Sequence, residues 1–354
     1  MFFNTHIHTF RDIDVPRKFL PLGLVRILAS KPGYFITAKF LNNLNPFSNN
    51  DLFDRYIKFV RIGKLGSQRK IFENCMIFYP EGTQFVILPM DMAFMGAGKV
   101  PREYPDQLKE LGELNKIYPQ IYPTIHVDPR RPKVLDLLKK SVDEWGTKGI
   151  KLYPPLGYFP YDERLYPVYE YCQKNNLPVI AHCSPYNPVH YKGSKTDIIK
   201  LLSVSQTPIE TNGKSKKELC SNFTNPLKYS RVLNDFKELR ICLAHFGSEY
   251  MWEKYLTEPG DENNWFVIIK DMVLRYTNLY SDISFTLNNQ EFFPLLKVLL
   301  SNEKLKRKIL FGSDYYMVET KTTERKFSLD LRAYIGEANF TQIATINPKE
   351  FLGI

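Results

Sequence analysis

Short apolar runs alternate with amphipathic segments along most of the chain. The runs are nearly continuous in apolar character, which is typical of strands buried on both faces of a parallel sheet. They lie at 1–10, 85–91, 120–127, 149–153, 178–182, 240–245, 278–284 and 308–314. Helical spacing of apolar residues marks the segments 101–118, 132–145, 162–175 and 292–305 between them. Eight strands alternating with helices predict an α/β protein with the (β/α)8 barrel fold.

An open doubly wound sheet is the alternative for such a pattern. That fold would need a glycine-rich phosphate turn after an early strand. Neither GxGxxG nor GxxxxGK[ST] occurs in the sequence. The barrel is therefore the favoured architecture, with residues 1–354 forming a single domain.

Two long segments interrupt the regular alternation. Residues 11–83 have mostly helical periodicity, with Asp51 as a candidate N-cap, and far exceed the usual connection of about 2 to 6 residues. We interpret this segment as a helical insertion after the first strand that forms a lid or a binding wall. Residues 187–221, rich in Lys, Ser, Thr and Asn, predict a loop insertion after the fifth strand.

Composition narrows the class of protein. With 354 residues, 44% hydrophobic and 24% charged, the chain can form a large core. The formal charge of +10 comes from small scattered groups of lysine and arginine, which indicates a solvated surface more than a nucleic-acid arm, although it could also attract an anionic substrate. The five cysteines include no CxxC pair, and no signal peptide or membrane span is evident. A cytoplasmic location is expected.

Candidate metal ligands follow the apolar runs directly. His6 and His8 are two residues apart, so in a strand both imidazoles share one face and can reach one ion. The C-terminal ends of the other predicted strands carry further candidates: Lys151 in the fourth strand, His182 in the fifth, His245 in the sixth and Asp314 in the eighth. In a barrel these ends meet at one face. Three histidines and a carboxylate would suit a zinc-type ion that keeps an open position for water.

Other titratable residues have plainer interpretations. A single buried histidine is more often a hydrogen-bonded structural group than a ligand, and this is our interpretation of His126. His190 lies in a polar segment and is expected at the surface. Lys151 could equally be a satisfied polar group at the barrel mouth. Asp91 and Asp282 could be helix caps or could hold a ligand in place, and neither is predicted to bind the metal.

The motifs resemble those of a known family. NTHIHTF, GIKLYPPLGYFPYDERLYPVYEY, LPVIAHCS, LAHFGS, NLYSDIS, LFGSDYY and the closing INPKEFLGI are similar to successive motifs of the amidohydrolase superfamily. They resemble in particular the amidohydrolase-related branch (amidohydrolase 2), which contains decarboxylases similar to aminocarboxymuconate semialdehyde decarboxylase. The resemblance spans nearly the whole chain. It implies a distorted TIM barrel with one or two divalent metals.

The resemblance also implies roles for individual residues. It assigns metal binding to His6, His8, His182 and Asp314. His245 would either bind a second metal or contact the metal-bound water and the substrate. Lys151 matches the position that is carboxylated and bridges two metals in binuclear members. Zinc is the favoured ion, with one ion favoured and two expected if Lys151 is carboxylated.

The residue types then predict a reaction class. Asp314 would take a proton from the metal-bound water and deliver it to the leaving group, while His245 would orient the water or stabilise an oxyanion. This predicts a metal-dependent hydrolase acting on a C–N or C–O bond of a small substrate that could be anionic. A non-oxidative decarboxylase of a small carboxylic acid is the alternative. A noncatalytic binding barrel and a nucleic-acid-binding protein are less favoured, no membrane partner is expected, and a homo-oligomer is left open.

Two local departures from the family pattern qualify the resemblance. Asp314 is followed by Tyr315 and Tyr316, where the family often has a proline two residues after the aspartate. Cys183 directly follows His182, so its thiol would either perturb the choice of metal or pack as a small apolar group.

Overall fold

Parallel strands form the centre of the structure, a computed structural model that describes residues 1–19, 61–187 and 189–354. One sheet has the order β1-β2-β3 and the other β4-β5-β6-β7-β8-β9, and every pairing is parallel. The strands are β1 (Phe3–Ile7), β2 (Gln84–Ile87), β3 (Ile121–Pro123), β4 (Ile125–His126), β5 (Ile150–Leu152), β6 (Val179–His182), β7 (Ile241–Ala244), β8 (Leu279–Asp282) and β9 (Ile309–Leu310).

Hydrogen bonds beyond these ladders close the sheet into a barrel. Thr124 separates β3 from β4, and both its N–H and its hydroxyl donate to the carbonyl of Ile87, at 3.1 and 3.0 Å. The two short strands thus act as one barrel strand, giving eight in all. At the other seam, the Thr5 N–H donates to Phe311 O at 2.9 Å and the Asp314 N–H donates to His6 O at 2.8 Å. The predicted (β/α)8 barrel is confirmed.

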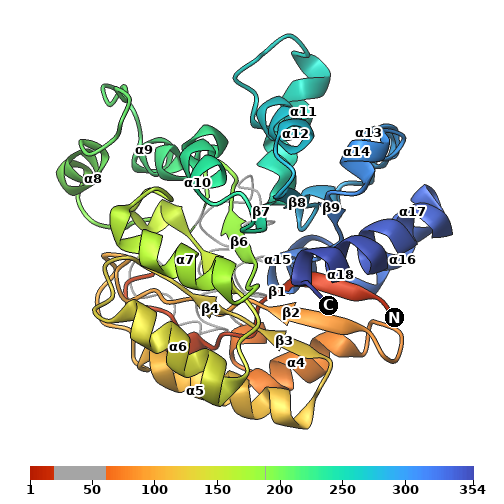
Figure 1. Ribbon diagram of the computed structural model, residues 1–354, viewed down its shortest axis with the longest axis horizontal. Coiled ribbons are helices and arrows are strands. Elements are labelled where there is room, and N and C mark those ends of the chain that lie inside the picture. Colours follow the sequence, from red (N-terminus) through yellow and green to blue (C-terminus); the bar gives the residue numbers. More distant parts are fainter. Residues whose placement is uncertain (20–60, 188) are drawn as a thin grey trace, which may run out of the picture.

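Helices surround the strands (Figure 1). They are α4 (Gln68–Met76), α5 (Tyr104–Ile117), α6 (Val134–Trp145), α7 (Tyr166–Lys174), α8 (Lys195–Leu202), α9 (Lys216–Ser221), α10 (Ser230–Asp235), α11 (Glu249–Thr257), α12 (Trp265–Arg275), α13 (Phe293–Leu300), α14 (Glu303–Lys306), α15 (Tyr315–Lys321), α16 (Glu324–Ile335), α17 (Glu337–Thr341) and α18 (Asn347–Leu352). α5 and α6 approach closely because Gly112 has no side chain: a Cβ there would lie 2.6 Å from the Cβ of Trp145.

An apolar cluster fills the N-terminal end of the barrel. Its members come from strands on all sides of the cylinder, so they must point inward, and they include Phe3, Val86, Ile180, Cys242, Tyr280 and Leu310. Phe351 of α18 packs onto this cluster, and its carbonyl accepts a hydrogen bond of 2.6 Å from Arg240, the residue before β7. The C-terminal helix therefore closes this end of the barrel.

The predicted loop at 187–221 is wrong, because two helices, α8 and α9, lie within it. Each begins with a reciprocal capping box that satisfies two backbone N–H groups. In α8 the partners are Ser194 and Asp197, and in α9 they are Ser215 and Glu218. The polar composition that indicated a loop is in part the composition of these caps.

The predicted insertion at 11–83 lies largely outside the described residues, as does its candidate cap Asp51. Its described parts include a short 3-10 helix, η1 (Asp12–Asp14), and α4. The predicted helical periodicity is interrupted before α4, where Gly66 has a φ of +89° and the Ser67 hydroxyl caps the new helix. Across the described ranges, no helix combines the length and the apolar character needed to cross a bilayer.

Candidate active site

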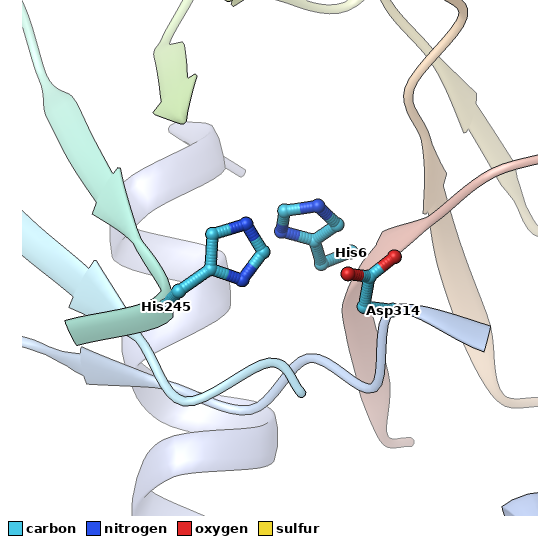
Figure 2. A group of neighbouring side chains, drawn as sticks. All are labelled: His6, His245 and Asp314. Atoms are coloured by element: carbon cyan, nitrogen blue, oxygen red, sulfur yellow. The ribbon is translucent and has the colours of Figure 1, made fainter. Parts of the chain in front are cut away.

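The predicted site residues gather at the C-terminal ends of the barrel strands. Their side chains are buried, with relative exposures from 0% to 9%: His6 on β1, His8 just beyond it, Lys151 on β5, His182 at the end of β6, His245 after β7 and Asp314 after β9. Ligand atoms of His6, His245 and Asp314 all lie within 4.8 Å of one another. Figure 2 shows these three side chains converging from three separate elements.

His6 is held by groups from β8 and the turn that follows it. Its Nδ1 lies 2.9 Å from Oδ2 of Asp282 and 3.1 Å from Oγ of Ser284. A carboxylate only accepts hydrogen bonds, so Nδ1 carries the proton and Nε2 keeps its lone pair. Burial, followed by the charge of Lys151, lowers the pKa of His6 to about 4. His6 is therefore neutral at pH 7 and fit to bind a cation.

His8 and Asp314 face each other across the site. The His8 Nδ1–H donates to Leu88 O at 2.6 Å, so its Nε2 lone pair points toward Asp314, with Oδ1 3.6 Å away. Burial raises the pKa of Asp314, although Lys151 opposes that shift. Asp314 also adopts a left-handed backbone conformation, with φ 61° and ψ 54°. Such strain in a non-glycine residue is concentrated at functional sites.

His182 and His245 form the other side of the cluster. The His245 Nδ1–H donates to Ser284 O at 3.0 Å, which leaves Nε2 as an acceptor. That atom lies 3.0 Å from Nδ1 of His182. The other nitrogen of His182, Nε2, lies 3.2 Å from the Ser184 hydroxyl, which itself donates to Asn187 Oδ1 at 2.7 Å. The Ser184 oxygen therefore accepts a proton from Nε2, and the lone pairs of His182 and His245 face each other.

Lys151 is fully buried in the site. Its exposure is 0%, and its Nζ has no hydrogen-bond partner among the residues that the structure describes. Burial lowers the pKa of this lysine to about 8, although Asp282 and Asp314 raise it. The neutral amine is therefore easier to reach near neutral pH than in an exposed lysine.

Asp282 and Ser284 connect two of the histidines, which agrees with the second of the two roles predicted for Asp282. Oδ1 of Asp282 accepts from the backbone N–H of His245 at 2.9 Å, while Oδ2 binds His6. The Ser284 hydroxyl contacts Nδ1 of both His6 and His245, at 3.1 and 3.0 Å. Burial disfavours the charge of Asp282, but His6 and His245 hold its pKa below its usual range. The pair fixes the orientation of both imidazole rings.

The donor set fits a divalent cation. His6 Nε2, Lys151 Nζ and Asp314 Oδ1 are buried and lack a hydrogen-bond partner within the described part of the chain. Buried polar atoms left unpaired are costly, and a bound cation would satisfy the His6 and Asp314 acceptors.

His126 has the structural role predicted for it, whereas His190 is more buried than the predicted surface residue. Nδ1 of His126 accepts from the Asp91 N–H at 2.8 Å, and the Asp91 carboxylate pairs with Arg131. His190 is partly buried, and its Nδ1 lies 2.8 Å from Asn187 O. The Cys183 thiol donates to Thr224 O at 3.4 Å, so it packs as a buried group. All five cysteines are free.

A cavity of about 330 Å³ opens above the cluster. His8, His182, His245 and Asp314 line its base. The walls are largely aromatic and methionine side chains: Phe10, Met90, Met92, Tyr153, Phe285, Tyr316 and Met317. The strand ends therefore open into a space of the size that a small molecule occupies.

The family follows from the sequence. Residues 111–354 match the family model described as Amidohydrolase. The chain belongs to the amidohydrolase family. It is accordingly an enzyme of the amidohydrolase type, and the predicted resemblance is confirmed. No curated protein matches the chain.

Solved structures support the same fold. An uncharacterised TIM-barrel protein from Bordetella bronchiseptica is 15% identical, with a TM-score of 0.56 over 99% of this chain and 98% of that one. 4-Oxalomesaconate hydratase from Rhodopseudomonas palustris is also 15% identical, with a TM-score of 0.55 over 100% of this chain and 96% of that one. At these identities the likeness concerns the amidohydrolase fold alone.

Proposed function

We propose that this amidohydrolase is a metal-dependent hydrolase that cleaves a C–N or C–O bond of a small substrate. One observation carries the proposal: imidazoles from three strands and a strained carboxylate converge at the base of a cavity, with buried ligand atoms left unpaired. A purely structural cluster would satisfy these atoms within the chain, as His126 does.

The hydrogen bonds support a proposed set of ligand atoms. Nε2 of His6 and Nε2 of His8 keep their lone pairs because their Nδ1 atoms bind Asp282 and Leu88 O. Nδ1 of His182 and a carboxylate oxygen of Asp314 complete the proposed set. Nitrogen and carboxylate ligands of this kind suit zinc, so we propose one zinc ion as the cofactor.

A divalent cation bound there would supply Lewis acidity, making a water more acidic and polarising a substrate carbonyl. Asp314 lies beside this position, and burial raises its pKa, so it can accept a proton from the water and later donate it to the leaving group. His245 presents the Nε2 lone pair toward the same space, and Ser284 fixes its ring, so it can accept a hydrogen bond from the attacking water and orient it.

Lys151 determines whether a second cation can bind. The neutral form that its lowered pKa favours is the form able to take up a carboxyl group, which would add two oxygen ligands at the centre of the barrel. In the unmodified form its Nζ would repel a second cation. The number of bound metal ions would therefore indicate whether Lys151 is carboxylated.

A decarboxylase is the second candidate, because Asp314 lines the base of the cavity and could deliver a proton to the carbon from which CO2 departs. The protein would then need no attacking water. The same residues serve either reaction.

The deciding experiment combines metal analysis with two assays. Purified enzyme, as isolated and after chelation and zinc reloading, is offered lactones and esters with proton release as the readout, amides with amine release as the readout, and aromatic or enoic acids with CO2 release as the readout. Metal-dependent release of protons or amine without CO2 supports the hydrolase, and CO2 release supports the decarboxylase. Absence of bound metal, with activity unaffected by chelation, would overturn the proposal.

A further inference from the structure

The cavity carries little charge apart from the base where the proposed metal would lie. No lysine or arginine occurs among the described residues that line it, and its only carboxylates are Glu249 and Asp314. A negative group in the body of a ligand would find no cationic partner on these walls.

Aromatic side chains line the cavity between its base and its mouth. The rings of Phe10 and Tyr316 stack with centroids 4.9 Å apart and planes 9° from parallel. Tyr153 stacks on His182 at 4.2 Å, directly at the base. Tyr186 and Tyr250, exposed by 42% and 49%, meet edge to face at 5.4 Å at the mouth. An aromatic ring entering this space would contact ring faces and edges over most of its surface.

Glu249 adds a specific penalty for a second anion. It lines the cavity from the start of α11, and its Oε2 accepts a hydrogen bond of 2.7 Å from Lys321 Nζ. That lysine also lies over the Phe285 ring, at 5.4 Å from its centroid. Lys321 is therefore already paired with Glu249.

We infer that the ligand of this site has one polar group, which faces the histidine cluster, and an uncharged aromatic body. Glu249 is the residue that selects against a carboxylate on that body. This inference rests on the proposed function, because the polar group is taken to meet a bound metal.

Three hydroxamates test the inference without requiring turnover, since a hydroxamate chelates a metal through its own two oxygens. The probes are benzohydroxamate, acetohydroxamate and 4-carboxybenzohydroxamate, titrated calorimetrically into the zinc-loaded enzyme. Benzohydroxamate should bind about ten- to a hundredfold tighter than acetohydroxamate because it buries a phenyl ring. It should also bind at least about tenfold tighter than the 4-carboxy compound.

The variant Glu249→Gln should tighten binding of the 4-carboxy compound by about tenfold and leave benzohydroxamate unchanged. Glu253→Gln is the matched control, because Glu253 is exposed on the same helix and does not line the cavity. Melting curves of both variants check that the fold is intact.

Each outcome decides the question. Equal affinity for benzohydroxamate and acetohydroxamate, tight binding of the 4-carboxy compound, or identical behaviour of the two variants would overturn the inference and leave the metal centre standing. Failure of all three hydroxamates to bind the zinc-loaded enzyme would refute the metal centre itself, and the inference with it.

Discussion

The two ends of the barrel differ although the same strands build both. On β6 the inward residue Ile180 belongs to the apolar cluster, and His182, two positions later, belongs to the site. On β8 the same step leads from Tyr280 to Asp282. Two residues along a strand thus separate the part of the barrel that stabilises the fold from the part that carries chemistry.

The difference is also one of energy. The N-terminal end buries apolar side chains against α18, which is favourable by roughly 25 cal/mol per Å² of apolar surface. The C-terminal end buries polar atoms without partners, at about 1–3 kcal/mol each. It also holds His245 and Asp314 at positive φ, 71° and 61°. The stability gained at the N-terminal end of the barrel offsets the strain at the C-terminal end.

The largest effect is expected from Asp314→Asn. Removing a proton-transfer group should lower kcat by about 10²- to 10⁴-fold, while circular dichroism and the melting temperature stay close to those of the wild type. The assay is whichever of proton release or CO2 release the wild-type enzyme supports. Wild-type turnover in this variant would refute the proton-transfer role.

Shortening an apolar side chain at the N-terminal end of the barrel should instead lower stability and leave the metal site unchanged. Phe351→Ala removes a fully buried ring from the apolar cluster and should lower the free energy of unfolding by about 3–5 kcal/mol in urea titrations. Metal content per folded molecule should stay the same. Leu329→Ala, at a side chain 50% exposed on α16, is the control and should change stability by less than about 0.5 kcal/mol. Loss of metal from the Phe351 variant would mean that the two ends are not separable.

The variant Asp282→Asn tests whether Asp282 holds the His6 ring in position to bind the metal. Because Asp282 fixes the Nδ1 proton of His6, its loss should weaken metal affinity by about 10- to 100-fold in competition with a chromogenic chelator. Asp91→Asn is the control, since Asp91 is equally buried but its carboxylate pairs with Arg131. Equal metal affinities in the two variants would show that Asp282 is only structural.

The smallest effect concerns a buried carboxyl group outside the cavity. Burial raises the pKa of Glu324 from 4.5 to about 7, while Tyr79 donates to its Oε1 at 2.6 Å. The folded state therefore binds a proton between these values that the unfolded state releases, and the stability from this group is lost as pH rises from about 4.5 through 7.

Glu324→Gln keeps the acceptor for Tyr79 and removes the titration. The variant should be more stable than the wild type at pH 8, on the order of 1 kcal/mol, and should lose this advantage at pH 4.5. Urea titrations across that range measure the difference. A difference independent of pH would show that Glu324 is charged in the folded protein.

Much of the site could be predicted because its residues follow buried strands directly. The apolar runs located the strands, and parallel strands in a barrel bring residues as distant as His6 and Asp314 together. The strand break at Thr124 was not predictable, since it depends on the Thr124 side chain reaching Ile87 O. For Asp282 the sequence left a helix cap and support of a ligand both open, because nothing in it says that the carboxylate meets Nδ1 of His6.

Helices α8 and α9 could have been predicted from the sequence, but the segment was predicted to be a loop. Their capping boxes, Ser194 with Asp197 and Ser215 with Glu218, stand in the sequence at the required spacing. Lysine-rich, polar composition outweighed that local signal in the prediction. Helix α8 is short and buries only Ile198 and Leu202. A helix with so few buried residues shows little hydrophobic periodicity in its sequence.

The most direct test of the central claim is anomalous scattering from crystals of the enzyme as purified, recorded on both sides of the zinc edge. The account predicts a peak that appears only above the edge and is bound by Nε2 of His6, Nε2 of His8, Nδ1 of His182 and a carboxylate oxygen of Asp314. A map with no peak at these atoms, from protein that is folded and active, would contradict it.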